Sequence, residues 1–210
     1  MKRVINLDNW NRKEHFKFFS ALDDPFWGIT TTVDFTSIYQ QSKNMEVSFF
    51  LYSVHFLLKC INATTAFKLR IENGEVVEYD KINISPTIGR DGTFGFGFFE
   101  YDTDLSLFIE NAEKEIHRVK NSTGLSFSKD TARADVIRYS ALPWFAFSEM
   151  KHAGSIQTGD SIPKISTGKL IQEKKKLLLP ISISVHHGLV DGRNVAEFIQ
   201  NVKDGQNNTL

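Results

Sequence analysis

The stretch PISISVHHGLVDGRNVAEFIQ, residues 180–200, decides the fold because it predicts a buried strand followed directly by a helix. Its first half alternates apolar and small polar side chains up to two adjacent histidines, which is typical of a strand. Its second half carries apolar residues at helical spacing, namely Val195, Phe198 and Ile199, and the spacing continues to Val202. We therefore predict a strand that ends near the histidines, a short turn, and a final helix.

The two histidines are expected to point in opposite directions, because successive side chains on a strand alternate between its faces. His187 continues an apolar row, whereas His186 shares its face with serines; the two rows are Ile181, Ile183 and Val185, and Ser182 and Ser184. Partial burial at the end of the apolar row can hold an imidazole neutral, as a general base requires. A histidine on an apolar face is also commonly a satisfied core residue, so both interpretations remain open here.

Asp191 stands where the final helix is predicted to begin, and its carboxylate suits the N-cap position. From this position it can fix the turn behind His187 without touching a substrate. A metal site is a weaker interpretation, because adjacent histidines on a strand diverge and no third ligand is apparent. We predict no metal.

Outward from this stretch, hydrophobic periodicity and turn residues predict the remaining elements. We expect helices over residues 10–20, 45–61 and about 102–120, the last capped by Asp102 or Asp104. Asn73-Gly74 between two alternating runs predicts a hairpin. Further strands are expected over residues 27–35, 93–101, 136–141, 164–172 and 176–185, with loops over 121–134 and 148–163. Glycines in the 93–101 strand indicate close approach to its backbone.

This mixed order of elements lacks a regular βαβ repeat and predicts an α+β two-layer sandwich. We expect a mixed, largely antiparallel sheet with helices packed on one face, in a single domain over residues 1–210. No hexapeptide periodicity is present, which excludes the left-handed β-helix acyltransferases.

Charge and composition narrow the class of function. Lys+Arg and Asp+Glu both total 25, so a nucleic-acid partner, which calls for a basic face, is not expected. The single cysteine, Cys60, excludes a disulfide scaffold and favours a reducing cytoplasm. No signal peptide is expected, and the longest apolar run, residues 47–58, is too short to span a membrane. The 18 phenylalanines predict an aromatic core, an aromatic pocket, or both.

The segment HHGLVDG, residues 186–192, resembles the His-His-x-x-x-Asp-Gly turn of the chloramphenicol acetyltransferases, whose form is shared by dihydrolipoamide acyltransferase domains. Four further blocks are similar to that family in the same order: WNRKEHFKFF (10–19), FKLRIENGEVVEYD (67–80), SALPW (140–144) and LLLPISISVHHG (177–188). The blocks span nearly the whole chain, and we identify it on this basis as a member of the family.

The resemblance implies a mechanism and roles for individual residues. His187 would be the general base that takes the proton of an acceptor hydroxyl, which attacks the thioester of acetyl-CoA. Ser140 would donate a hydrogen bond to the tetrahedral oxyanion, and Asp191 with Arg12 would form a structural ion pair that holds the histidine turn. Trp144 and Lys169 would line the coenzyme tunnel. The acceptor pocket would include Phe19, Trp27 and Ser166, the last replacing a threonine, although aromatics there are as readily core packing.

Departures from the family pattern concern the surroundings of the site. Ser184, Gly188, Arg193 and Asn194 stand where the antibiotic-acetylating members carry glutamine, alanine or serine, an aromatic residue, and histidine. The segment DGTFGFG, residues 91–97, replaces Thr-Glu-Thr-Phe-Ser. The resemblance therefore implies the chemistry more strongly than the acceptor.

We expect a cytoplasmic, acetyl-CoA-dependent O-acetyltransferase that acetylates the primary hydroxyl of chloramphenicol and confers resistance. The family also implies a homotrimer with active sites between subunits, and no nucleic-acid or membrane partner. A different small hydroxylated acceptor remains open, as does a non-catalytic binding protein with the same fold. A dihydrolipoamide acyltransferase is disfavoured, because no lipoyl domain or Ala/Pro-rich linker is expected, and a serine hydrolase is disfavoured because no Gly-x-Ser-x-Gly occurs.

Overall fold

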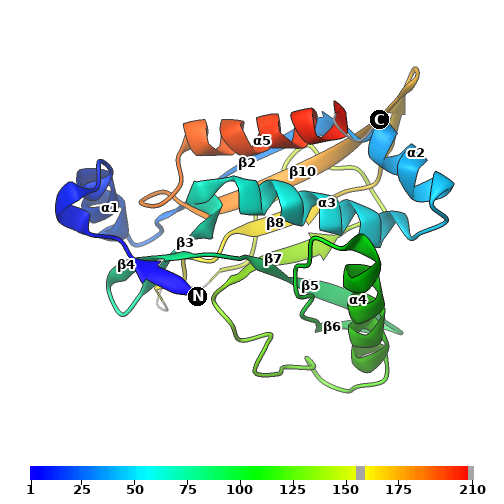
Figure 1. Cartoon of the computed structure of the whole chain (residues 1–210), viewed down its shortest axis with the longest axis horizontal. Coiled ribbons are helices and arrows are strands. Elements are labelled where there is room, and N and C mark those ends of the chain that lie inside the picture. Colours follow the sequence, from blue (N-terminus) through cyan, green and yellow to red (C-terminus); the bar gives the residue numbers. More distant parts are fainter. Residues whose placement is uncertain (155–158, 208–210) are drawn as a thin grey trace.

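A computed structural model describes residues 1–154 and 159–207 of the 210-residue chain. Within these residues a large sheet has the strand order β2-β10-β8-β7-β5-β6, with β9 paired to β10 (Figure 1). The strands are β2 (Phe26–Asp34), β5 (Asn83–Arg90), β6 (Thr93–Phe96), β7 (Val136–Ala141), β8 (Lys164–Thr167), β9 (Ile171–Glu173) and β10 (Lys176–His186). Pairing is antiparallel except between β5 and β7 and between β7 and β8. The sheet is mixed and largely antiparallel, as predicted.

A smaller sheet orders β1 (Lys2–Val4), β4 (Glu75–Tyr79) and β3 (Leu69–Glu72) side by side. The β3–β4 hairpin turns at Asn73 and Gly74, which both have positive φ angles, 53° and 82°. The hairpin predicted from this dipeptide is therefore confirmed, since a tight turn of this kind needs left-handed backbone at both positions.

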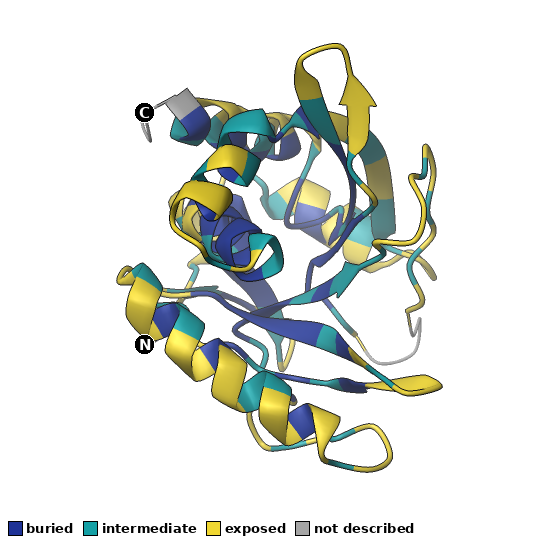
Figure 2. Ribbon diagram, turned by 90° about the vertical axis from the view of Figure 1, so that its right-hand side faces the viewer, coloured by how far each residue is buried: buried dark blue, intermediate teal, exposed yellow. Residues whose placement is uncertain are grey.

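The helices α3 (Phe49–Ala63) and α5 (Gly192–Asn207) lie along one side of the large sheet (Figure 1). The other helices are α1 (Lys13–Ser20), α2 (Thr36–Asn44) and α4 (Leu105–Lys120), with short 3-10 turns at Leu7–Asn9 and Thr65–Lys68. The buried residues lie on the inward sides of these helices and on the central strands, while α4 exposes its outer side (Figure 2). The predicted α+β sandwich is confirmed.

Register divides the large sheet into two faces, because cross-strand partners share a face. The helix face, the one covered by α3 and α5, carries an apolar row in which Ile181, Ile183 and Val185 are fully buried. The opposite face, here called the open face, carries polar residues on the central strands: Thr30, Ser140, Lys164, Ser166, Ser182 and Ser184. The segment after β7 lies against the open face, where Ser182 Oγ donates to the Met150 carbonyl oxygen at 3.4 Å.

The element prediction missed β1 and was wrong in three further details. α2 was not expected, because its mostly polar sequence TSIYQQSKN has a weak apolar stripe, with Ile38 buried. The single strand expected over residues 164–172 is divided into β8 and β9 around Gly168, whose backbone packs against Phe147. The strand expected over 93–101 is β6 alone, followed by one bridge between Ile84 and Phe99. The loop expected over 148–163 falls partly on residues 155–158, outside the described residues.

Close approach to the glycines of β6 is confirmed at Gly95. A Cβ atom there would lie 2.5 Å from Ser126 Oγ, closer than any real contact, so only glycine fits between β6 and the segment after α4. Asp104 caps α4 by accepting from the backbone N–H groups of Ser106 and Leu107. The acidic cap expected at this helix is therefore confirmed at the second of its two candidates.

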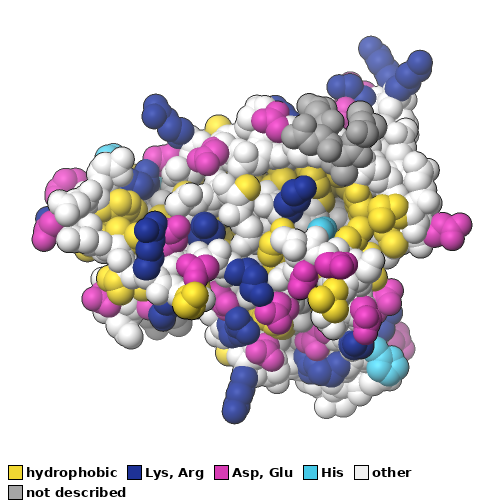
Figure 3. Space-filling model, viewed as in Figure 1, with side chains coloured by type: hydrophobic (Ala, Val, Ile, Leu, Met, Phe, Trp, Pro, Cys, Tyr) yellow, Lys and Arg dark blue, Asp and Glu magenta, His cyan; other side chains and the backbone are white. Residues whose placement is uncertain are grey.

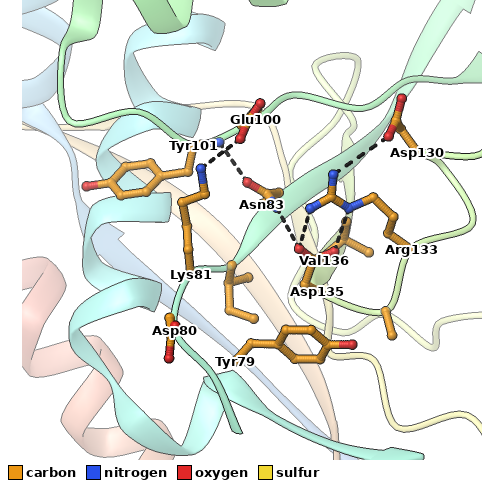
Figure 4. A network of polar contacts seen from close by, with 12 residues as sticks. Tyr79, Asp80, Lys81, Asn83, Glu100, Tyr101, Asp130, Arg133, Asp135 and Val136 are labelled. Atoms are coloured by element: carbon orange, nitrogen blue, oxygen red, sulfur yellow. Dashed lines mark hydrogen bonds and ion pairs between the residues drawn. The ribbon is translucent and has the colours of Figure 1, made fainter. Parts of the chain in front are cut away.

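A polar network ties the polar segment after α4 to the start of β5 and β7 (Figure 4). Arg133 makes paired hydrogen bonds of 2.8 and 2.6 Å to Asp135, whose carboxylate also accepts from Asn83 at 3.0 Å. Asn83 in turn accepts from the backbone N–H of Tyr101. Burial alone would raise the pKa of Asp135, but hydrogen bonding and charge from Arg133 outweigh this and lower it. These groups satisfy one another, so the network is structural.

Candidate active site

His187 directly follows β10 and is half-buried in a turn against β2 and α1. Its backbone N–H donates to the Pro25 carbonyl oxygen at 2.8 Å, which extends the antiparallel ladder by one residue. Its ring stacks on Phe19 at a centroid distance of 3.8 Å and an interplanar angle of 10°, with Trp27 at 5.4 Å. Nδ1 is buried without a hydrogen-bond partner among the described residues.

The turn that carries His187 is fastened by Arg12 and Asp191. The Arg12 guanidinium forms an ion pair with Asp191 and donates a second hydrogen bond to the His187 carbonyl oxygen at 3.2 Å. Asp191 also accepts from the backbone N–H groups of Arg193 and Asn194, so it caps α5 as predicted. Asn194 returns a bond, because its side-chain oxygen accepts from the Asp191 N–H at 3.0 Å. The asparagine that departs from the family pattern thus completes a reciprocal cap.

His186 is 3% exposed and lies on the other side of the strand, edge-on to Phe26. Its Nδ1 accepts from the Gly188 N–H at 3.2 Å. Burial lowers its pKa to about 4 against a smaller opposing effect of Asp160, so it is neutral at pH 7. A Cβ at Gly188 would lie 3.1 Å from the His186 ring and 3.3 Å from Phe16, which accounts for glycine at this position.

Ser140 lies on β7 in a row of hydroxyl groups that crosses the open face. The row runs through Thr30, Ser182, Ser166 and Ser140, which are consecutive register partners. It is prolonged by Thr87 of β5, whose hydroxyl donates to Ser140 Oγ at 3.1 Å. Because that bond uses an acceptor site of Ser140, its own O–H stays directed elsewhere and can donate to an oxyanion. Thr87 was not found from the sequence, since nothing local pairs it with Ser140.

Ser166 is fully buried and its Oγ lies 3.0 Å from Nε2 of His152. Trp144 and Lys169 lie beyond the ends of β7 and β8, and both are exposed, Trp144 to 73%. The Lys169 N–H donates to the Phe145 carbonyl oxygen at 3.0 Å, so the segments of these two predicted coenzyme residues are held side by side.

The predicted residues form two clusters that one chain does not bring together. The histidine cluster contains His187, Phe19, Trp27, Arg12 and Asp191; the serine cluster contains Ser140, Ser166, Trp144 and Lys169. Ser182 is the β10 position in register with Ser166, and Ser166 with Ser140. His187 lies five residues beyond Ser182, and at about 3.3 Å per residue this places it roughly 16 Å along the strand from the row that contains Ser140. One acceptor hydroxyl therefore cannot meet His187 and Ser140 of the same chain at once.

A cavity of about 550 Å³ opens on the open face along β2. It is lined by residues 24–30 of β2 and the segment before it, by residues 148–152, and by Gly154, Asp160, Lys164 and Ser184. His152 joins this cavity to the serine cluster through Ser166, and Pro25 joins it to the histidine turn. This cavity was not predicted, because His152, Asp160 and Lys164 lie in or beside a segment with no periodic pattern.

In residues 1–154 and 159–207, no group of three or more His, Cys, Asp or Glu side chains is placed to hold a metal ion. None of the helices described is long and apolar enough to cross a membrane. Acidic and basic side chains are interspersed on the face shown in Figure 3, without a continuous patch of either sign.

Two solved structures of acyltransferases have a similar arrangement. A chloramphenicol acetyltransferase superimposes with a TM-score of 0.89 at 29% identity, covering 98% of this chain and 100% of the other. A probable dihydrolipoamide acetyltransferase from Listeria monocytogenes gives a TM-score of 0.69 at 13% identity over 98% of this chain and 94% of that one, which shows the fold alone. The fold is thus that of the acyltransferases in this group.

Sequence comparison narrows the class further. The chain is 27% identical to chloramphenicol acetyltransferase 3 of Escherichia coli over 98% of this chain and 97% of the relative. It is 27% identical to the chloramphenicol acetyltransferase of Staphylococcus aureus over 95% and 93%. The family model for chloramphenicol acetyltransferase matches residues 2–203. The chain belongs to the chloramphenicol acetyltransferase family and is an acetyltransferase of that type.

Proposed function

We propose that this chain transfers the acetyl group of acetyl-CoA to a hydroxyl of a small acceptor, with His187 as general base. The observation that carries the proposal is the histidine turn, which Arg12 and Asp191 hold from outside while the ring stays stacked on Phe19. Chloramphenicol is the first acceptor to consider, since the relatives are named for it. Resistance to chloramphenicol would then be the biological consequence.

The reaction needs no covalent intermediate on the protein. Nε2 of His187 takes the proton of the acceptor hydroxyl as the oxygen attacks the thioester carbon. The tetrahedral oxyanion accepts a hydrogen bond from Ser140, a contact of a type whose loss costs about 3–4 kcal/mol of transition-state stabilisation. Collapse of this intermediate expels the CoA thiolate, which takes the proton from His187, so the products are an acetate ester and free CoA thiol.

The separation of the two clusters supports a site built between copies of the chain. We propose that His187 of one subunit faces Ser140 of its neighbour in a ring-shaped homotrimer. A heterologous contact of this kind closes into a ring when each copy offers a different surface to the next. Phe19 and Trp27 would then border the acceptor from the histidine side, and Ser166 from the serine side.

The exposed indole of Trp144 and ammonium of Lys169 suit the coenzyme, whose ring and phosphates offer a stacking surface and negative charge. Cys60 is a free, buried thiol whose pKa is raised to about 12 by burial, which makes it unreactive. A free thiol supports placement in a reducing cytoplasm.

The test is release of CoA thiol from acetyl-CoA with chloramphenicol present, followed by identification of the ester. We expect acetylation at the primary hydroxyl, with a catalytic efficiency at or below the lower end of the common range of about 10⁴–10⁸ M⁻¹ s⁻¹. The His187→Ala variant serves as the blank. Thiol release that is equal in parent and variant, or that no alcohol stimulates, would overturn the proposal.

A further inference from the structure

The cavity on the open face has an ion pair in its wall. Lys164 Nζ lies 3.2 Å from Asp160 Oδ2 and 4.1 Å from the centroid of the Phe26 ring. Both side chains are largely covered, with 9% and 16% of their surface exposed. Gly154 closes over the ammonium, since a Cβ there would lie 3.0 Å from Nζ. The pair is therefore packed into the wall.

A buried ion pair of this kind is weak evidence for a role in stability. Apolar side chains of similar size would often serve a fold as well or better, because charges lose hydration when they are buried. Ser184, the register partner of Lys164 on β10, adds a hydroxyl to the same wall. Charged and hydroxyl groups gathered around a cavity indicate a ligand that forms hydrogen bonds with them.

His152 adds an imidazole to this group. Its Nδ1 is buried and has no partner among the described residues, while Nε2 lies 3.0 Å from Ser166 Oγ. Burial, and then the charge of Lys164, lower its pKa, which favours the neutral ring.

The covered charges of the wall indicate the class of ligand, since the other charged residues of the lining, Asp24, Glu149 and Lys151, are exposed to water. Lys164 and Asp160 neutralise one another, so a charged acceptor would compete with one of them and leave the other unpaired in a partly buried wall. Adjacent hydroxyl groups of a neutral ligand can instead donate to Asp160 and accept from Lys164 without disturbing the pair. Phe26 and Trp27 supply an apolar surface beside these groups.

We propose that this cavity binds a neutral polyhydroxylated acceptor, a polyol or sugar, through Lys164 and Asp160. The inference rests on the proposed acetyltransferase function: the cavity, which His152 joins to Ser166, would hold the acceptor beside the proposed site. The ion pair sets specificity: it favours an acceptor with adjacent hydroxyls over one whose main recognition group is an apolar ring.

The experiment compares catalytic efficiency for chloramphenicol with that for a panel of neutral polyols: glycerol, methyl β-D-glucopyranoside and isopropyl β-D-thiogalactopyranoside. In the double variant Lys164→Met/Asp160→Leu, we expect the efficiency ratio of the best polyol to chloramphenicol to fall about tenfold or more, because hydrogen bonds to charged groups are lost. KM for acetyl-CoA should not change. Lys114→Met/Glu110→Leu, which removes an exposed ion pair of α4 outside the cavity, is the matched control and should leave the ratio unchanged.

The thermal midpoint is measured for each variant, and Lys164→Gln/Asp160→Asn, which keeps shape but removes charge, replaces the double variant if that fails to fold. A parent enzyme that acetylates chloramphenicol and no polyol would overturn the inference while the proposed function stands. So would a ratio that stays within twofold in both charge-removing variants. Release of no thiol with any alcohol would instead overturn the proposed function.

Discussion

Arg12 and Asp191 lie 179 positions apart in sequence and form an ion pair that joins the start of α1 to the start of α5. Arg12 also donates to the backbone oxygen of His187. One guanidinium therefore fixes both ends of the turn from His187 to Asp191, and neither residue of the pair needs to touch a substrate.

Breaking this pair should lower stability and activity together. We expect Asp191→Asn to reduce the thermal midpoint by several degrees and kcat by at least about tenfold, since removing one partner leaves a partly buried guanidinium unpaired. Thermal unfolding and steady-state kinetics measure the two effects. Lys13→Met is the matched control, because Lys13 pairs with the exposed Asp8 outside the turn, and it should change neither. Activity lost without any change in stability would contradict the structural role.

The Arg12–Asp191 pair also predicts a response to acid. Burial alone would raise the pKa of Asp191, but the hydrogen bond and charge of Arg12 outweigh it, so the folded-state pKa lies below the ordinary 3.8. A depressed carboxyl pKa contributes stability that is present above the unfolded-state value and is lost as pH falls through the folded-state value. We expect the difference in unfolding free energy between parent and Asp191→Asn to shrink below about pH 4. Chemical denaturation at pH 7 and pH 3 measures it, and an equal difference at both would contradict the prediction.

Substitution of the two adjacent histidines should have very different effects on kcat. We expect His187→Ala to lower kcat by about 10²–10⁴-fold, the usual range for loss of a general base, with little effect on the thermal midpoint. His186→Ala should retain much of the activity if the fold survives, because its ring is buried against Phe26 on the other face. Equal kcat for parent and His187→Ala would exclude the base assignment.

His186 should make the protein less stable in mild acid. Its pKa in the folded state is lowered to about 4 by burial, against an ordinary 6.5, so the unfolded chain binds the proton first. The stability of the parent should therefore fall as pH drops from about 6.5 towards 4. His186→Gln keeps a polar side chain that does not titrate, and we expect a shallower fall over this window. Denaturant midpoints at pH 7 and pH 5 test this; the same fall in both proteins would contradict it.

The strand–turn–helix unit was predictable because its signals are local. Alternation up to His186, an acidic cap at Asp191 and helical spacing after it each lie within a few residues, and the structure has all three. α2 gave no such signal, since it contacts α3 and β10 through few apolar side chains. Its formation depends on tertiary packing around Ile38, which sequence periodicity does not reveal.

The candidate site was predictable only in part, because many of its contacts join residues that are far apart in the sequence. Arg12 and Asp191 were paired through a family resemblance, and no local pattern joins residues 179 positions apart. In the sequence, Lys164 is only the polar first residue of a predicted strand. Its contacts with Asp160 and Phe26, which indicate a binding role, are visible only in the folded structure. Thr87 and His152 were missed because each acts through a serine on a neighbouring strand.

A catalytic role of Ser140 can be distinguished experimentally from a role in packing. We expect Ser140→Ala to lower kcat roughly 10²-fold with little change in KM, because an oxyanion contact forms in the transition state. Ser182→Ala is the matched control: Ser182 lies in the same hydroxyl row but donates to the Met150 carbonyl oxygen, and it should leave kcat nearly unchanged. A Ser140→Ala variant altered only in KM would rule out the oxyanion role.

The separation of His187 from Ser140 yields the sharpest prediction about assembly. If each site pairs His187 of one subunit with Ser140 of the next, His187→Ala and Ser140→Ala subunits should rescue one another. In a ring of three that contains both variants, one interface joins an intact histidine to an intact serine. Unfolding and refolding the two variants together in equal amounts should therefore restore about a quarter of parental activity, since about three quarters of rings are mixed and each has one working site of three. Mixing His187→Ala with His187→Gln is the control and should restore nothing. Activity no higher than the mean of the separate variants, in mixed rings verified by mass, would overturn the proposal that His187 and Ser140 share a site between subunits.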